Sequence, residues 1–352
     1  IRPRDWSSDV CSSDLYVSKH GAHYYNFWRD ARNPRGIWRR TSLEEYRKPE
    51  PKWETVLDLD ALSAAEKENW VWKGADWLEP DLDRVLLSLS RGGADATVTR
   101  EFDPIAKAFV PGGFTLPEAK SGTSWRDRDT LYVGTDFGAG SLTDSGYPRV
   151  VKEWRRGTPL ASAKIVFEGT KEDVVVSPGV FHGPEGSMPL VVRAVSFFES
   201  EHFFVTPEGT TVKLPLPLSA DVKGVTAALI AGDNSEQLIA TLRKDWTPEG
   251  QKTIPQGSLI AFPLKLFLAT HVMPRVQVLY TPNARSSISG VQATSDAVYA
   301  SIFENVTGSI NMLDARLKIF VHLQPAAFVG LQTDALQAEL LGGADAARRI
   351  DQ

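Results

Sequence analysis

Short runs of β-forming residues, separated by turn residues, recur along the chain and limit the folds that it can adopt. Each run is of strand length and is rich in β-branched, leucine or aromatic residues. Clear examples are Val85–Ser90, Thr130–Phe137, Leu190–Phe197 and Arg275–Tyr280. The 27 glycines and 22 prolines are spread along the sequence. This distribution indicates many short elements joined by tight turns.

Several of these runs pair as predicted hairpins. His202–Thr206 and Thr210–Leu214 flank Pro207-Glu208-Gly209, where glycine can adopt the positive φ of a tight turn. Ala227–Ile230 and Gln237–Leu242 flank a second turn, Gly232–Ser235. Helix is predicted only for Leu62–Asn69 and for about the last 20 residues.

The hairpins fall into six groups of roughly 40–50 residues, each with four strands. The groups cover about residues 16–60, 70–117, 121–173, 174–217, 220–264 and 276–314. This repeat is typical of a β-propeller, whose four-stranded blades bury both faces against their neighbours. A β-sandwich followed by a second β domain is the alternative. We favour the propeller, because about 300 residues without a helical segment is long for sandwiches. The predicted fold class is therefore all-β.

The two ends of the chain differ from this pattern. A common sequencing-library adapter translates without a mismatch into Asp5–Leu15, so we interpret residues 1–15 as an artefactual leader and exclude them. The only cysteine, Cys11, lies in this leader, which leaves no basis for a disulfide or a thiol nucleophile. Residues 315–352 form an atypical tail, partly helical or frameshifted, and the propeller is expected over 16–314.

Bulk composition excludes some classes of protein. The formal net charge of −5 argues against a nucleic-acid binder, which usually carries a basic excess on one face. No stretch approaches 18 consecutive apolar residues, the length expected of a membrane-spanning helix. A cytoplasmic and a periplasmic location both remain open.

Motifs for catalysis are missing. An α/β-hydrolase carries its nucleophile in G-x-S-x-G, and the nearest sequence, Gly122-Thr123-Ser124, lacks the second glycine. There is no phosphate loop and no dinucleotide fingerprint, and Gly138-Ala139-Gly140 is predicted to be a plain loop. We therefore predict no catalytic, cofactor-binding or metal-binding residue and no cofactor.

Histidines and paired aspartates are the remaining candidates for chemistry. The histidines are His20, His23, His182, His202, His271 and His322. His20 and His23 do not share a face of one strand, so a metal role is disfavoured. Asp58/Asp60, Asp81/Asp83 and Asp127/Asp129 have the i, i+2 spacing that a propeller glycosidase could use. All three pairs adjoin turn signals, which favours Asx-turn roles.

Two basic doublets and one glycosylation pattern complete the candidates. Arg39-Arg40 and Arg155-Arg156 could line a propeller opening and orient a peptide carboxylate, although solvated loops are favoured. Asn305-Val306-Thr307 fits a glycosylation acceptor, which matters only for a secreted eukaryotic protein.

Several long strings carry a family resemblance. They are His23–Leu62, Asn69–Leu78, Ser88–Asp103, Leu131–Leu160 and Pro255–Leu264, and all are rich in Trp, Gly or Arg. They resemble the N-terminal propeller of bacterial prolyl oligopeptidase-family serine peptidases over most of residues 16–310. The resemblance implies a seven-bladed propeller that caps an α/β-hydrolase domain and admits only short peptides to the catalytic serine, typically for cleavage after proline.

The sequence departs from this family pattern in ways that shape the functional expectation. Six blades are visible where seven are expected, so the propeller is predicted to be incomplete. The Ser, Asp and His of the hydrolase domain are absent, so the chain alone is expected to be an inactive, substrate-gating fragment. Its expected partners are the hydrolase domain of its parent protein and oligopeptide substrates, with no nucleic acid and no membrane. A stand-alone propeller scaffold is the alternative function.

Overall fold

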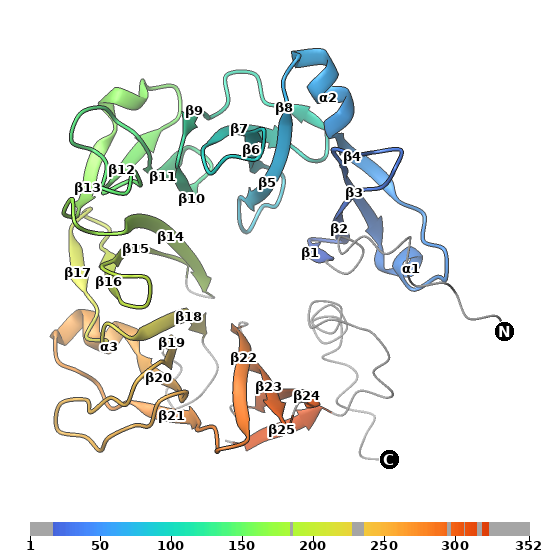
Figure 1. Cartoon of the computed structure of the whole chain (residues 1–352). Helices are drawn as coiled ribbons and strands as arrows, with labels where there is room; N and C mark the ends of the chain where they lie inside the picture. The colour runs from blue at the N-terminus through green and yellow to red at the C-terminus, as the bar shows by residue number, and fades with distance from the viewer. Residues whose placement is uncertain are drawn as a thin grey trace. The chain divides into compact units, whose positions relative to one another are not determined.

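A computed structural model describes residues 17–183, 186–226, 236–293, 297–305, 307–314 and 319–323. These residues form an all-β propeller fold with six blade sheets (Figure 1). Every strand pairing inside the sheets is antiparallel, and the strands of each sheet follow one another in chain order, apart from one additional edge strand. The described residues divide into two compact units, 17–119 and 120–323.

The first unit contains two sheets. The first sheet comprises β1 (Ser18–His20), β2 (His23–Trp28), β3 (Ile37–Ser42) and β4 (Glu54–Asp58). The second comprises β5 (Trp70–Trp77), β6 (Val85–Arg91), β7 (Thr97–Asp103) and β8 (Ala108–Phe109), with β9 (Thr115–Ala119) also paired to β7. Two helices accompany them, α1 (Leu43–Tyr46) and α2 (Leu59–Glu66).

Aromatic side chains fill the space between these two sheets. Trp38 lies 5.1 Å from Tyr25, 5.3 Å from Trp72 and 5.7 Å from Trp77, measured between ring centroids. Rings at these separations and tilted to one another pack favourably beyond the area that they bury. The tryptophans of the sequence are therefore used here for packing the core.

The second unit contains four sheets. Its first two are β10 (Gly122–Asp127), β11 (Thr130–Gly134), β12 (Val150–Arg155) and β13 (Lys164–Glu168), then β14 (Val175–Gly183), β15 (Gly186–Ala194), β16 (Ser200–Val205) and β17 (Thr211–Lys213). The next two are β18 (Ala220–Thr226), β19 (Gln237–Leu242), β20 (Leu259–Pro263) and β21 (Gln277–Tyr280), then β22 (Ser286–Ala293), β23 (Ala297–Glu304), β24 (Thr307–Asp314) and β25 (Ile319–Leu323). A 3-10 helix, η2 (Leu160–Ser162), and α3 (Leu264–Thr270) lie in the connections.

Two middle strands of these sheets, β11 and β20, are buried along their whole length. Every residue of β11 and of β20 is buried, without the alternation of a sheet that has one wet face. Separate apolar clusters join neighbouring sheets, as where Leu190 of β15 packs in one cluster with Val225 of β18 and Phe262 of β20. The sheets that contain β11 and β20 therefore bury both faces of these strands, as expected for propeller blades.

Local predictions and the structure agree at the first hairpin and differ in the helices. β16 and β17 flank the predicted turn, where Gly209 has φ of +82°. The predicted helix at Leu62–Asn69 begins earlier, because Asp58 caps α2 through its Oδ1, which accepts the Ala61 N–H. The helices α1 and α3 were not predicted, and the turn Gly232–Ser235 lies outside the described residues.

The fifth sheet extends beyond the predicted limit of its group at residue 264. The helix α3 follows β20 and buries Leu264 and Phe267, and β21 then returns to pair with β20. The run Arg275–Tyr280 thus supplies the last strand of the fifth sheet, where the prediction made it the first of the sixth.

The sixth sheet begins at Ser286 and includes β25, which lies within the predicted tail. The leader and residues 324–352 lie outside the described residues, and a seventh blade stays a prediction.

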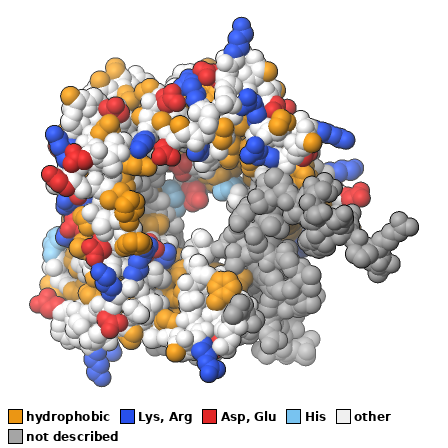
Figure 2. All heavy atoms as spheres, viewed as in Figure 1, with side chains coloured by type: hydrophobic (Ala, Val, Ile, Leu, Met, Phe, Trp, Pro, Cys, Tyr) orange, Lys and Arg blue, Asp and Glu red, His pale blue; other side chains and the backbone are white. Residues whose placement is uncertain are grey.

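None of the described helices is both long and apolar enough to cross a bilayer. On the face drawn in Figure 2, cationic and anionic side chains are interspersed, with hydrophobic side chains between them. This face therefore presents charges of both signs and no large patch of one sign.

Candidate functional site: a pocket between two sheets

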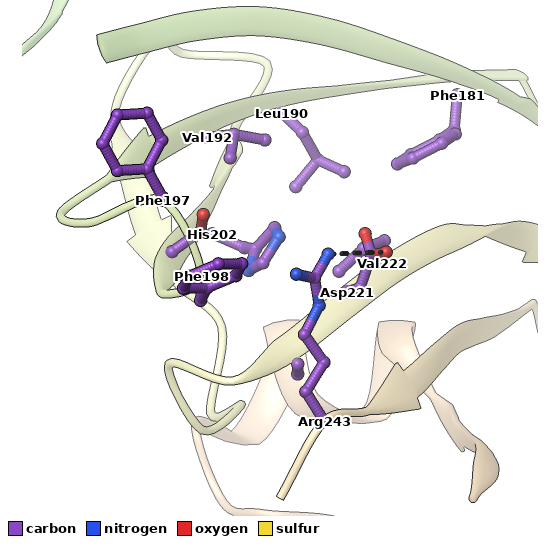
Figure 3. Close-up of a pocket in the computed structure, with 11 residues that line it drawn as sticks. Phe181, Leu190, Val192, Phe197, Phe198, His202, Asp221, Val222 and Arg243 are labelled. Atoms are coloured by element: carbon purple, nitrogen blue, oxygen red, sulfur yellow. Dashed lines mark hydrogen bonds and ion pairs between the residues drawn. The ribbon is translucent and has the colours of Figure 1, made fainter. Parts of the chain in front are cut away.

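A pocket of about 150 Å³ lies between the sheet β14–β17 and the sheet β18–β21 (Figure 3). Leu190 and Val192 of β15 form part of its apolar wall, and Phe181 of β14 adds an aromatic ring. The first residues of β18, Ala220–Val222, line the opposite side. The pocket is therefore formed by side chains from two neighbouring blades of one compact unit.

Two phenylalanines stand at the mouth of this pocket. Phe197 and Phe198 lie in the turn between β15 and β16 and are 86% and 74% exposed. The turn is held by two N–H groups, of Val195 and Ser196, that donate to the Glu199 carbonyl. Because the two rings are adjacent in a turn and not on one face of a strand, the fold does not draw them into its core. They leave apolar surface available to another molecule.

His202 lies deeper in the pocket and has an unsatisfied ring nitrogen. The residue is 6% exposed, and its Nδ1 has no hydrogen-bond partner. Burial lowers the pKa of the imidazole, and the nearby charge of Asp221 opposes that shift only in part. The ring is therefore neutral at pH 7. An unpaired buried polar atom of this kind costs about 1–3 kcal/mol of stability.

Asp221 and Arg243, which line the pocket with His202, belong to a group of charged residues from both blades. The Asp221 carboxylate pairs with Lys223 Nζ at 2.6 Å and with an Arg243 terminal nitrogen at 3.5 Å. Lys244 Nζ pairs with Glu199 at 2.8 Å beside the same turn. The cluster thus has three cations and two carboxylates, so its net charge is positive.

The aspartates singled out from the sequence act in turns and caps. The Asp58 carboxylate caps α2, and Asp60 accepts the Arg35 N–H at 3.2 Å. Asp127 Oδ1 accepts the Asp129 N–H at 2.9 Å, which is an Asx turn. Asp83 lies 3.5 Å from Arg84 in the loop before β6, the loop that also holds Asp81. Asp127 thus forms the expected turn contact, whereas Asp58 caps a helix.

The arginine doublets are engaged within their own sheets. Arg40 Nε lies 2.5 Å from Glu54, and Arg39 stacks over the rings of Trp28 and Trp53. Arg156 Nε pairs with Asp129 at 2.9 Å, whereas Arg155 is 75% exposed. Arg39 and Arg40 lie within the strand β3, so the predicted solvated loop is wrong for this doublet, and these contacts leave little of Arg39, Arg40 or Arg156 for a ligand.

The sequence predicted one strand for His20 and His23, which is wrong. His20 ends β1 and His23 begins β2. They face each other across the turn between β1 and β2, because Gly21, with φ of +61°, reverses the chain there. The His20 ring stacks on Trp77 at 4.1 Å between centroids.

The other histidines are dispersed. His182 Nδ1 lies 3.1 Å from Ser187 Oγ, His271 caps the C-terminus of α3, and His322 lies in β25. Within the part of the chain that the structure describes, no three His, Cys, Asp or Glu side chains are grouped as a metal site would need.

Short motifs noted in the sequence have structural explanations. Gly122-Thr123-Ser124 lies inside the strand β10 and not at a strand-to-helix turn. Gly138-Ala139-Gly140 forms a loop in which Asp136 accepts the Gly138 N–H. Asn305 follows β23, and Val306 of the glycosylation pattern lies outside the described residues.

The pocket residues were not found by sequence reasoning. His202 was noted only as one of six histidines, and no motif connects it with Asp221 or Arg243. Phe197 was predicted as the end of a strand, and Phe198 was not singled out. The available signal was that two successive aromatic residues beside Glu199 cannot both face the interior of a strand.

Comparison with known proteins identifies the kind of domain. Residues 11–333 match the family model described as the prolyl oligopeptidase N-terminal beta-propeller domain. An uncharacterized peptidase from Sinorhizobium fredii is 39% identical over 294 residues, which are 82% of this chain and 39% of that protein. One from Rickettsia prowazekii is 28% identical over 307 residues, 84% of this chain and 42% of that protein.

Solved structures agree with this assignment. A post-proline cleaving enzyme from Rickettsia typhi superposes with a TM-score of 0.79 at 27% identity, over 89% of this chain and 46% of that one. The propeller domain of the trilobed protease from Pyrococcus furiosus gives a TM-score of 0.55 at 11% identity, over 90% of this chain and 85% of that one, which shows the fold alone. This chain spans about two fifths of the length of the curated relatives that it matches. It belongs to the prolyl oligopeptidase family, to whose N-terminal β-propeller domain its sequence corresponds.

Proposed function

We propose that this chain is the non-catalytic, substrate-gating propeller of a prolyl oligopeptidase-like serine endopeptidase that acts on short peptides. In this proposal the α/β-hydrolase domain of the parent protein carries the catalytic Ser, Asp and His and lies outside the sequence. The main support is the family match over residues 11–333, in a chain that covers only 39% and 42% of its curated relatives.

Two further observations support the assignment of the chemistry. The sequence has no G-x-S-x-G, the turn on which an α/β-hydrolase holds its nucleophile. The Rickettsia typhi enzyme, described as post-proline cleaving, has the TM-score of 0.79 reported above. Cleavage after proline through an acyl-enzyme is therefore the reaction that we propose for the parent protein.

The physical role proposed for the propeller is exclusion. A catalytic serine covered by packed blades can be reached by a short, flexible peptide, whereas a folded protein is too large to enter. Such a cap changes the ratio of kcat/KM values between substrates without taking part in the chemistry.

The test uses one proline-containing cleavage sequence in two settings, a peptide of about ten residues and a loop of a folded protein. The parent protein, with propeller and hydrolase domain together, should cleave the peptide at least about 100-fold faster by kcat/KM. Unfolding and fragmenting the second substrate should restore its cleavage, which controls for the sequence itself. Equal rates on the folded protein and the peptide would refute the gating role.

Sequencing the gene on both sides of the region that encodes this chain distinguishes the stand-alone scaffold from this proposal. The proposal expects an in-frame G-x-S-x-G segment downstream of the region that encodes this chain. If sequencing past both ends finds no hydrolase segment, the scaffold interpretation replaces it.

A further inference from the structure

The pocket of Figure 3 combines polar and apolar features that the packing of the blades does not require. One polar atom of its lining, Nδ1 of His202, is buried and unpartnered. Packing alone would favour an apolar residue here, because a buried ring nitrogen without a partner weakens the fold. A ligand atom that hydrogen-bonds Nδ1 would satisfy it.

Arg243 provides a second group suited to a ligand. Figure 3 shows its guanidinium reaching into the pocket between the His202 ring and Asp221. Its contact with Asp221 is 3.5 Å long, whereas Lys223 holds the same carboxylate at 2.6 Å. A guanidinium has five N–H donors and matches the two oxygens of a carboxylate. Asp221 therefore leaves much of the hydrogen-bonding capacity of Arg243 available.

The charge balance favours an anion at this position. Among the described residues, Arg243, Lys223 and Lys244 form ion pairs with two carboxylates, those of Asp221 and Glu199. One bound carboxylate would bring the cluster to neutrality. The Arg243 side chain is 51% exposed, so an anion can reach it from solvent.

The apolar walls of the pocket determine the size and polarity of the rest of the ligand. Phe181, Leu190 and Phe198 are apolar, and the cavity holds about 150 Å³. An apolar protein cavity of about that volume accommodates benzene. The space therefore suits one branched aliphatic or aromatic group of similar size.

We propose that this pocket binds a monocarboxylate that carries one apolar side group, with the carboxylate on Arg243 and His202 and the apolar group against Phe181, Leu190 and Phe198. The proton on Nδ1 of the imidazole would donate to one carboxylate oxygen. The C-terminal residue of a peptide and a free branched or aromatic acid share this chemistry. All of these residues belong to this chain, so binding can be measured on the chain by itself.

Binding of N-acetyl-leucine to the full chain tests the site by calorimetry, with N-acetyl-leucinamide as the matched ligand that lacks the charge. The acid should bind with a Kd of the order of 1 mM, and the amide at least about tenfold more weakly. The Nδ1 resonance of His202 in ¹⁵N NMR should shift with the acid. Equal binding of acid and amide, or an unchanged resonance at saturating acid, would overturn the proposal.

Variants separate the site from nonspecific attraction. Arg243→Gln should weaken binding of the acid about tenfold or more, and His202→Phe, which keeps a ring in place, about fivefold. Arg155→Gln removes an exposed arginine from another sheet and should leave the affinity unchanged. Circular dichroism and thermal unfolding show whether each variant is folded. A folded Arg243→Gln that binds as well as the unchanged chain would contradict the proposal.

Two further ligands distinguish the sources of the carboxylate. If a tetrapeptide ending in leucine binds at least about tenfold more tightly than 4-methylpentanoate, the site reads a peptide C-terminus. If the two bind equally, it takes small free acids. Both results support the carboxylate site, and binding of neither would overturn it.

Discussion

Two titratable residues of the first unit change its stability in opposite directions with pH. Burial lowers the pKa of His20 to about 4, below its ordinary value of 6.5. Burial, with a smaller contribution from the charge of Glu79, raises the pKa of Asp76 to about 7 from 3.8. Between pH 4 and 6.5 the unfolded chain binds more protons than the folded one at His20 and fewer at Asp76. Because these effects largely cancel, the pH profile of the unchanged protein reveals neither.

The contribution of His20 becomes measurable in an Asp76→Asn background. There the free energy of unfolding should fall as pH drops from 6.5 to 4, by about 3 kcal/mol, because only the unfolded chain takes up a proton at this residue. Adding His20→Phe, which keeps a ring against Trp77, should remove that fall. Urea unfolding at several pH values measures both proteins, and parallel curves would show that His20 is not buried as described.

Residue type predicted the roles of side chains in local turns and caps better than it predicted contacts between residues far apart in the sequence. Asp127 forms a turn, as its neighbouring residues indicated, and Asp58 caps a helix. Both contacts are local, because they span only two or three residues. The pocket around His202 could not be predicted in this way. Its partners Asp221 and Arg243 come from another sheet, and their approach depends on how blades pack.

At the scale of elements, the connection between β13 and β14 depends on a residue without a side chain. A Cβ on Gly169 would lie 2.5 Å from Asp173 Oδ2 and 2.7 Å from Val176 Cγ2. That Asp173 oxygen accepts the Thr170 N–H at 2.6 Å and Arg193 Nε at 2.9 Å. The Asp173 carboxylate, which holds the turn and pairs with Arg193 of β15, therefore occupies the space that a side chain at residue 169 would need.

Gly169→Ala should lower the free energy of unfolding by about 2 kcal/mol or more, because the added methyl group displaces the Asp173 carboxylate. Gly179→Ala is the matched control: no atom lies within 4 Å of its added Cβ, and it should change stability by less than about 1 kcal/mol. Chemical unfolding of both variants measures the difference. Equal stability of the two would contradict the described turn.

Strand pairing shows where sequence reasoning reaches its limit. The hairpin of β16 and β17 was predicted because its turn, Pro207-Glu208-Gly209, is local. The strand β21 was recognised, but assigned to the following group, because pairing with β20 across α3 is a long-range contact. The strand β25 was hidden in a tail whose alanine-rich end dominated its composition.

At the scale of the whole molecule, periodicity and family resemblance led to the same fold. The repeat of four-stranded groups predicted blades, and the structure has six such sheets among the described residues. The quoted strings predicted the prolyl oligopeptidase family, which the match over residues 11–333 confirms. Buried middle strands such as β11 and β20 explain why the repeat was visible, since each blade must be covered on both faces.

We propose that this chain provides the propeller of a serine peptidase and carries no nucleophile. The direct measurement is labelling of the purified chain with a fluorophosphonate probe, followed by an assay with a proline-containing peptide. A known serine peptidase in the same experiment serves as the positive control. We expect no labelling and no hydrolysis above background, whereas stoichiometric labelling of one serine in this chain, with cleavage after proline, would refute the proposal.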